Sequence, residues 1–343
     1  MGPRPLKEET TGAEVAAFNN RLVSCSELRS AEKPQRALER YGELMRTHIL
    51  PTLGELKLQK IDSTHIDALY LSIEDKMSLS TARAVHNVLG ACLAAAVRTR
   101  KLSVSPMQHV TKVPPKAEGD HGIALNEQEL GKLITGFKGH SLFTIVGTAA
   151  FTGARRGEIL ALRWSDLDIQ ENPLRIERSV EQTSKYKLRF KGPKKENHKR
   201  TIKIDDDLLA LLLAERDKHL RLVASVPDSA PVTLIVKLPH EALIFPDPQA
   251  MLNGDFATPR SAVSVTKMFA RKASSLGFKL RLHDLRGTHE TLHLDRGTPV
   301  HVVATRCGHN PATLLRNYAK RTRKADTTAA GIIGSISKGI LGN

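Results

Sequence analysis

Six side chains between residues 155 and 318 could together break a phosphodiester bond with a protein nucleophile. Two arginines could grip the non-bridging oxygens of a phosphate through paired, permanently charged donors. A tyrosine phenol could attack phosphorus and hold one end of the cut strand, and a lysine or histidine could protonate the leaving oxygen. The candidates are Arg155, Lys194, His283, Arg286, His309 and Tyr318.

Spacing places four residues at two predicted helix starts. His283 and Arg286 are three residues apart, so one helix would aim both side chains at the same point. Glu158 stands at the same spacing from Arg155, on a helix that follows a Thr-Gly turn. Glu158 then either makes an ordinary helix-stabilising ion pair or supports Arg155 in the site, and we adopt the supporting role.

Tyr318 follows His309 by nine residues. Asn310-Pro311, between them, is a typical helix start, with Asn as the N-cap and Pro in the first turn. The helix that begins there could carry Tyr318 back over the site. Each of these residues alone has an ordinary interpretation as a surface cation, a helix-end histidine or a half-buried aromatic, but the ordered set favours a single site.

Composition narrows the class of partner. The 343 residues predict two domains, and the formal net charge of +16 with a pI near 9.9 favours a polyanion, nucleic acid first and an acidic membrane surface second. Aromatic residues make up only 4% of the chain, which argues against base stacking on an aromatic platform. Cys25, Cys92 and Cys307 are far apart and form no CxxC pair, so neither a disulfide framework nor a Cys-based zinc site is predicted.

The start of the sequence lacks the apolar core of a signal peptide. No apolar run reaches the roughly 18 residues that a membrane helix needs. We therefore expect a cytoplasmic, nucleoid-associated protein with no membrane partner.

Pattern changes along the chain predict five segments. The segments are a polar, poorly ordered lead-in (1–33), a helical domain (34–113), a linker rich in Pro, Gly and charge (114–123), a mixed domain (124–326) and a C-terminal tail (327–343). The predicted fold is mostly α with a small antiparallel sheet. The apolar tail either docks on a neighbouring protomer or is a frayed end.

Local signals set the expected boundaries within these domains. We expect Pro51 to stop the first helix and Ser63-Thr64 to cap the second. Strands are predicted at 174–180, 186–190 and 200–204, the last two joined by a polar turn rich in lysine. The basic segments 191–200 and 316–324 are phosphate-contact candidates, with solvated turns and helix ends as the alternative.

Two sequence boxes resemble those of the tyrosine recombinases, the phage integrase family. Residues 152–158 fit the family's first box, T-G-x-R-x-x-E. The second box, H-x-x-R, then G-H and then a tyrosine nine residues later, fits His283, Arg286, His309 and Tyr318. Residues 47–54 and 61–66 are similar to the family's core-binding domain. The resemblance covers roughly residues 35–325 and implies a helical core-binding domain followed by an α+β catalytic domain.

The family's lysine lies on a β-hairpin before a basic strand. Residues 193–195, before the strand start at 199–202, match this pattern, and Lys194 aligns better than Lys195, which stays an alternative. The chain departs from the family pattern at Cys307, where Leu is usual, and at Gly287, where His is common. Neither change removes a catalytic group.

The resemblance implies a site-specific recombinase of a phage or mobile element that cuts and rejoins duplex DNA. Tyr318 would form a 3′-phosphotyrosine, while Arg155 and Arg286, helped by His309, would hold the non-bridging oxygens. His283 would assist as an acid or base near Tyr318. By the same resemblance, Lys194 would protonate the departing 5′-oxygen.

The family also implies the partners. These are double-stranded DNA attachment sites, further copies of the chain in a tetramer on DNA, and accessory DNA-bending or directionality factors. No cofactor and no metal are expected, because the phosphotyrosine conserves the energy of the broken bond.

Three other functions are compatible with parts of the sequence. A type IB-like topoisomerase shares the chemistry, and a catalytically decayed integrase relative would only bind DNA. His289, Glu290 and His293 form an H-E-x-x-H match, which is typical of zinc proteases. No third zinc ligand stands in an obvious context, so the recombinase interpretation is preferred.

Overall fold

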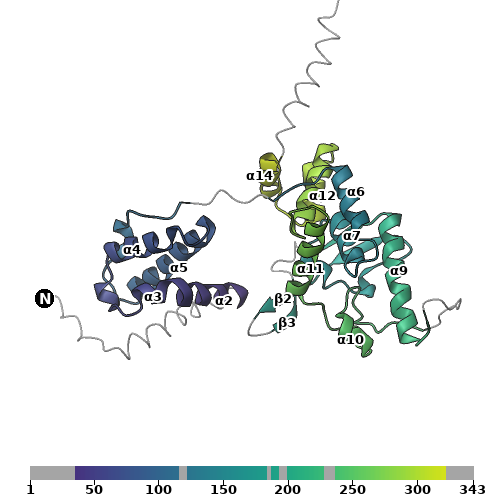
Figure 1. Ribbon diagram of the computed structural model, residues 1–343, viewed down its shortest axis with the longest axis horizontal. Coiled ribbons are helices and arrows are strands. Elements are labelled where there is room, and N and C mark those ends of the chain that lie inside the picture. The colour runs from purple at the N-terminus through teal and green to yellow at the C-terminus, as the bar shows by residue number, and fades with distance from the viewer. Residues whose placement is uncertain (1–34, 116–121, 184–186, 193–198, 228–235, 322–343) are drawn as a thin grey trace, which may run out of the picture. The chain divides into compact units, whose positions relative to one another are not determined.

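The computed structural model describes residues 35–115, 122–183, 187–192, 199–227 and 236–321, with side chains described up to Tyr318. The chain divides into two compact units, Met1–Gly119 and Asp120–Asn343 (Figure 1). We refer to them as the N-terminal and C-terminal units. The predicted lead-in, the C-terminal tail and most of the predicted linker lie outside the described residues, and the predicted domain limits stay predictions.

The regular secondary structure described in the N-terminal unit is entirely helical. Apolar side chains at three- and four-residue spacing face inward, and the buried set runs from Leu44 to Ala96. The elements are α2 (Gln35–Leu44), a π-helical segment (Met45–Ile49), α3 (Leu50–Leu53), a 3₁₀ turn (Leu58–Lys60), α4 (Ser63–Glu74), α5 (Leu79–Arg98) and a second 3₁₀ turn (Pro106–His109).

Pro51 does not stop the first helix, contrary to the prediction. The backbone widens into the π-helical turn Met45–Ile49, in which the Leu50 N–H donates to the Met45 carbonyl. Pro51 then falls in the first turn of α3, where a missing N–H costs little. The helical path therefore continues to Leu53.

The cap of α4 is also one residue earlier than predicted. Asp62, not Ser63, is the N-cap, and its carboxylate accepts from the His65 N–H at 3.0 Å. Asp62 is also bonded by the Thr64 hydroxyl. These contacts, the Thr64 hydroxyl first, lower the pKa of the Asp62 carboxyl to about 2. A charged aspartate carboxylate accepts the capping hydrogen bond more strongly than the Ser63 hydroxyl would, and Asp62 therefore takes the N-cap position.

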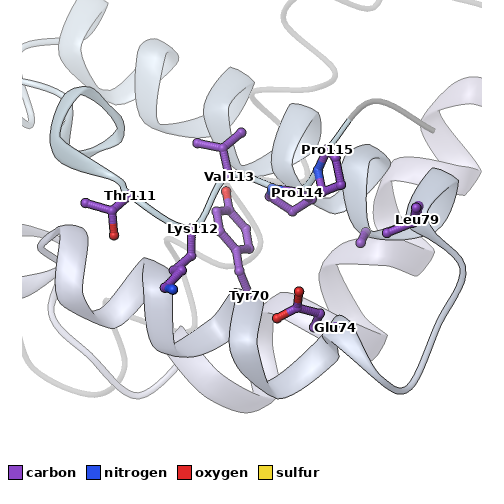
Figure 2. Close-up of a pocket in the computed structure, with 9 residues that line it drawn as sticks. Tyr70, Glu74, Leu79, Thr111, Lys112, Val113, Pro114 and Pro115 are labelled. Atoms are coloured by element: carbon purple, nitrogen blue, oxygen red, sulfur yellow. The ribbon is translucent and has the colours of Figure 1, made fainter. Parts of the chain in front are cut away.

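A cavity of about 210 Å³ lies in the N-terminal unit, between α4, the start of α5 and residues 111–115 (Figure 2). Tyr70 projects into it, and its hydroxyl lies 2.8 Å from His86 Nδ1. Asp67 accepts from the backbone N–H groups of Thr111 and Lys112. These bonds fix the chain against α4 as it leaves the helical unit.

The C-terminal unit contains the predicted mixture of helices and short strands. Its elements are α6 (Glu127–Gly136), α7 (Phe143–Thr152), α8 (Arg156–Ile159), a 3₁₀ turn (Trp164–Asp166), β1 (Pro173–Ile176), β2 (Ser179–Thr183), β3 (Lys187–Lys191), β4 (Arg200–Lys203), α9 (Asp206–Val223), α10 (Pro248–Leu252), α11 (Ala262–Ser275), α12 (Asp284–Asp295), α13 (Val300–Cys307) and α14 (Pro311–Arg321). The predicted fold class, mostly α with small antiparallel pairing, is confirmed.

The strand predicted at 174–180 is in fact two strands. β1 pairs antiparallel with β4, and β2 pairs antiparallel with β3, so the described strands form two separate pairs. Between β1 and β2 the Arg178 guanidinium turns to the Asp166 carboxylate, at 2.6 Å from Oδ1. This ion pair marks the bend where the chain leaves the first pair and enters the second.

Helix α7 lies in the middle of the C-terminal unit, where it packs against α12 and α9 (Figure 1). Nearly all of its side chains are buried, as expected for a helix that is apolar on every side. The helix ends at Gly153, whose left-handed backbone (φ 63°) closes its C-terminus. This ending puts the Gly153 turn beside α12. Among the described residues, no helix is long and apolar enough to cross a membrane.

Candidate active site

Arg155 stands at the turn between α7 and α8. A Cβ at Gly153 would come within 2.7 Å of the His289 ring, so the close approach of this turn to α12 requires glycine. Arg155 is the N-cap of α8, and its Nη1 lies 2.9 Å from Glu158 Oε1. The Glu158 carboxylate also accepts from the Arg155 backbone N–H at 2.8 Å. Glu158 therefore contacts both the backbone and the guanidinium of Arg155, while its supporting role in a reaction stays a prediction.

Glu158 has a second arginine partner that the sequence did not single out. Arg200 Nη2 lies 2.8 Å from Glu158 Oε2, and the Arg200 side chain is only 5% exposed. Burial raises the pKa of the Glu158 carboxyl, but the contacts with Arg200 and Arg155 outweigh it and lower the pKa to about 2. The Arg200 side chain is thus buried and bonded to protein groups, and the phosphate-contact role suggested for its segment stays a prediction.

The period of strand β4 could have indicated the inward position of Arg200. Arg200 and Ile202 are buried while Thr201 and Lys203 are exposed. Side chains alternate between the two faces of a strand. Arg200 therefore lies on the same inward face of β4 as Ile202. The prediction for this segment used only its positive charge and not the alternation of its side chains.

Arg286 lies in the first turn of α12 and is almost completely buried. Its Nη1 donates to the Gly153 carbonyl at 2.7 Å, and its Nη2 donates to the Cys307 carbonyl. Burial lowers the pKa of the Arg286 guanidinium, and the nearby positive charge of Arg155 adds to the effect. The predicted pair of phosphate-holding arginines is thus brought to one place, where both side chains bond to neighbouring carbonyls of Cys307 and Gly308.

Three arginines bind three consecutive carbonyls at the end of α13. Arg200 Nε donates to the Arg306 carbonyl at 2.8 Å, and Arg155 Nη2 donates to the Gly308 carbonyl at 3.0 Å. Arg286 Nη2 donates to the Cys307 carbonyl, which lies between those of Arg306 and Gly308 in the chain. The last carbonyls of a helix lack intrahelical partners and carry partial negative charge. The α13 terminus, closed by left-handed Gly308 (φ 63°), therefore gathers the cations.

His309 follows this terminus and faces Glu290. His309 Nε2 lies 2.9 Å from Glu290 Oε1 and 3.1 Å from Arg286 Nε. Glu290 Oε1 is also 3.2 Å from Arg286 Nε. Glu290 was considered only as part of the H-E-x-x-H match. Its spacing of four residues from Arg286 on a helix is the signal that could have marked it as a site residue.

We call these side chains the arginine cluster: Arg155, Glu158, Arg200, Arg286, Glu290 and His309. His283, the N-cap of α12, lies beside the cluster with an exposed surface. Partial loss of water around its ring lowers the pKa of His283, and the charge of Arg286 lowers it further. A lowered pKa favours the neutral imidazole, which can accept a proton.

Tyr318 is not brought to the cluster. Its hydroxyl donates to Asp295 Oδ1 at 2.8 Å, at the C-terminal end of α12. Asp295 and Arg286 are nine residues apart on this helix, which corresponds to about 13 Å along its axis. The predicted Lys194, and its alternative Lys195, lie outside the described residues.

The H-E-x-x-H residues are used for other contacts. His289 Nδ1 lies 2.9 Å from the Ala150 carbonyl, while Glu290 faces Arg286 and His309. Burial, and then the neighbouring His293, lower the pKa of His289 to about 3. In the described part of the chain no three His, Cys, Asp or Glu side chains are grouped as a metal site would require. The geometry gives the zinc interpretation no support.

A group of arginines around the end of α13, two of them buried and Arg155 half-buried, is the kind of site that can hold a phosphate. Comparison with known proteins identifies the class: the model of the phage integrase family matches residues 125–324. The chain belongs to this family. The predicted recognition and the predicted enzyme class, a tyrosine site-specific recombinase of a mobile element, are confirmed.

Individual relatives agree with this assignment. The chain is 24% identical over 326 residues to a "Tyrosine recombinase XerC-like" protein of Caldanaerobacter subterraneus, covering 90% of this chain and 80% of the relative. It is 22% identical over 324 residues to an integrase of Streptomyces ambofaciens, covering 90% and 77%.

Solved structures share the fold. The Tn1549 transposon integrase in complex with transposon right end DNA has a TM-score of 0.69 at 15% identity, covering 93% of this chain and 99% of that one. A lambda integrase dimer bound to a core site has a TM-score of 0.64 at 16% identity, covering 92% and 83%. At such identities the likeness concerns the fold alone.

Proposed function

We propose that this chain cuts and rejoins duplex DNA at attachment sites through a 3′-phosphotyrosine on Tyr318. The observation that carries the proposal is the arginine cluster, in which Arg155 and Arg286 are fixed by buried carboxylates and backbone carbonyls. Preformed donors of this kind stabilise charge that develops on the non-bridging oxygens in the transition state. His309, on the exposed side of the cluster, assists them.

The proposed reaction needs no outside energy source. The Tyr318 oxygen attacks phosphorus as its proton leaves, with His283 as the nearby acid or base. The bond from phosphorus to the 5′-oxygen breaks, and Lys194 donates a proton to that oxygen. Rejoining is the reverse reaction with a 5′-hydroxyl as the nucleophile, so the bond energy is kept in the phosphotyrosine.

The partners follow from the same proposal. Duplex DNA is the substrate, and the net charge of +16 supports it. Self-association on DNA to a tetramer is proposed because a lambda integrase tetramer bound to a Holliday junction shares this fold. Accessory DNA-bending or directionality factors, a cytoplasmic and nucleoid-associated location, and a DNA-binding role for residues 34–113 belong to the same proposal.

A nicked attachment-site substrate tests the function. Cleavage near the nick releases a short fragment, so a covalent protein–DNA adduct accumulates. Tyr318→Phe should abolish the adduct and leave DNA binding within a few-fold, because only the nucleophilic oxygen is removed. An adduct that persists in this variant would remove Tyr318 from its role.

A second duplex added to the trapped adduct separates the alternatives. A recombinase transfers the strand to the new duplex, whereas a type IB-like topoisomerase only reseals its own. A decayed, purely DNA-binding relative would form no adduct at all.

A further inference from the structure

Arg200 and Arg155 connect the same two parts of the C-terminal unit. Arg155 Nη1 lies 2.9 Å from Glu158 Oε1, and Arg155 Nη2 donates to the Gly308 carbonyl at 3.0 Å. Arg200 Nη2 lies 2.8 Å from Glu158 Oε2, and Arg200 Nε donates to the Arg306 carbonyl at 2.8 Å. Each arginine thus spans from the Glu158 carboxylate on α8 to the carbonyls at the C-terminal end of α13.

The two arginines differ in their exposure to solvent. The Arg155 side chain is 35% exposed, whereas that of Arg200 is 5% exposed. A guanidinium carries more N–H donors than the contacts with Glu158 and Gly308 use. Within the described residues, the Arg155 guanidinium makes no further hydrogen bond. Arg155 can therefore offer donors to a phosphate that arrives from solvent, while Arg200 stays behind it.

Arg200 is fixed where it can hold both groups that Arg155 binds. Strand β4 pairs with β1, and Arg200 lies opposite the buried Ile176. Arg200 Nη1 also lies 3.3 Å from Glu158 Oε1, so both carboxylate oxygens accept from this guanidinium. A Cβ at Gly308 would come within 3.0 Å of Arg200 Nη1. The Arg200 guanidinium therefore packs directly on the residue whose carbonyl Arg155 binds.

The charges around Glu158 support the same arrangement. Burial raises the pKa of the Glu158 carboxyl, and Arg200 then lowers it more strongly than Arg155 does, so that the pKa is about 2. A carboxylate shared by two guanidiniums neutralises neither of them completely, so Arg155 keeps positive charge for a phosphate. Donors that are already fixed stabilise developing charge without the cost of reorganisation.

We propose that Arg200 is a positioning residue for Arg155, because it fixes the two groups that orient the Arg155 guanidinium, the Glu158 carboxylate and the end of α13. The inference rests on the proposed function and adds to it a residue that acts through Arg155 rather than on the DNA. Without Arg200, Glu158 would be held by Arg155 alone, and the half-exposed arginine would have to orient its own support.

Arg200→Lys tests the positioning role, because it keeps the positive charge but removes the planar fork. In single-turnover assays at saturating protein, adduct formation on the nicked substrate should be about 10- to 10²-fold slower, since a small displacement of a group that grips the reacting phosphate has such an effect. DNA affinity should stay within a few-fold. Urea unfolding checks that the variant is folded at the assay temperature, and Arg200→Gln replaces it if it is not.

Two results with Arg200→Lys would overturn the proposal. The first is a cleavage rate within about threefold of normal, since misplacement of a phosphate-gripping group should cost more. The second is a loss confined to DNA affinity, since Arg200 would then act in binding and not through the reacting group.

Arg221→Lys is the matched control. Arg221 also joins a carboxylate to a backbone carbonyl, with Nε 2.6 Å from Asp217 Oδ2 and Nη1 3.1 Å from the Pro227 carbonyl. Its side chain is largely buried, and none of these groups belongs to the arginine cluster. Adduct formation should be unchanged in this variant. A loss equal to that of Arg200→Lys would show that the loss of any such fork is sufficient, and would overturn the proposal.

A double-mutant cycle shows whether Arg200 acts through Arg155. In an Arg155→Ala background, Arg200→Lys should change the rate less than about threefold, because the residue it positions is gone. If the full loss persists there, Arg200 acts through Arg286, His309 or the fold, and the proposal fails. An unmodified protein that forms no adduct, or a Tyr318→Phe variant that still forms it, would instead refute the proposed function.

A crystal structure of the DNA-free Arg200→Lys protein gives a readout without activity. Arg155 should have lost its contact with Glu158 or with Gly308, or should adopt more than one rotamer, because a single ammonium cannot hold both groups. An Arg155 side chain that keeps both contacts in one rotamer would overturn the inference, even if the cleavage rate has fallen.

Discussion

Glu158→Gln removes the counter-charge between Arg155 and Arg200 and should destabilise the C-terminal unit in a pH-dependent way. The pKa of the Glu158 carboxyl is lowered from 4.5 to about 2 in the folded protein. A difference of this size corresponds to about 3 kcal/mol of unfolding free energy at neutral pH. The variant should therefore be less stable than the unmodified protein by about this amount at pH 7, in line with the cost of removing one partner of a buried ion pair.

The sign of the pH dependence follows from the depressed pKa. The contribution is fully present above pH 4.5, the value for the unfolded chain, and is lost as pH falls through about 2. The difference between variant and unmodified protein should shrink to about 2 kcal/mol by pH 3.5. Other carboxyls with lowered pKa values, such as Asp62 and Asp255, titrate in both proteins and cancel in this difference.

Urea unfolding of both proteins between pH 7 and pH 3.5 measures the effect. Glu127→Gln is the control, because its carboxylate is exposed and lies outside the arginine cluster; surface pairs of this kind contribute roughly 0–1 kcal/mol. A Glu158→Gln variant as stable as the control at pH 7 would refute the reasoning. A stability gap that stays constant down to pH 3.5 would show that packing, not charge, causes the loss.

Three further predictions concern the reaction. Arg286→Lys should cleave about 10²-fold more slowly or worse in single-turnover adduct assays, because one ammonium cannot replace the planar donors; more than about a tenth of the normal rate would contradict this. Lys194→Ala should cut a normal phosphodiester far more slowly but a 5′-bridging phosphorothiolate at nearly the normal rate, since a thiolate leaves without a proton; rescue of Lys195→Ala instead would move the general acid by one residue. Asp295→Ala should speed single-turnover cleavage about two- to fivefold by releasing the Tyr318 hydroxyl, since a hydrogen bond of this kind contributes about 0.5–1 kcal/mol; an unchanged or slower rate would contradict a restraining role.

Sequence patterns were most informative where chemistry is local. The Thr-Gly turn before Arg155, the i+3 spacing of Glu158 and the start of α12 at His283 all follow from backbone and helix rules that act over a few residues. The sequence could mark Arg155, Arg286 and His309 as candidates for the same reason, whereas contacts between distant segments bring them together. Each of them stands at a helix end that the sequence marks with glycine or with a capping residue.

The missed features depend on contacts between distant segments. The strand period could indicate that Arg200 faces inward, but its partner Glu158 lies 42 residues away in the chain, and no local signal could identify that contact. The continuation of the helix past Pro51 needed a π-helical turn that propensity rules do not anticipate. The division of the strand predicted at 174–180 depends on β4, a partner that comes later in the chain.

The hydrogen bond between Tyr318 and Asp295 bears on how such a protein searches a genome. In the conformation described, the groups that would grip a phosphate and the oxygen that would attack it lie at opposite ends of α12. With Tyr318 as the proposed nucleophile, a protein in this conformation would bind DNA segments without nicking them. Under the proposed function, strand breakage would require a movement of α14, so fidelity would depend on when the nucleophile arrives as well as on where the protein binds.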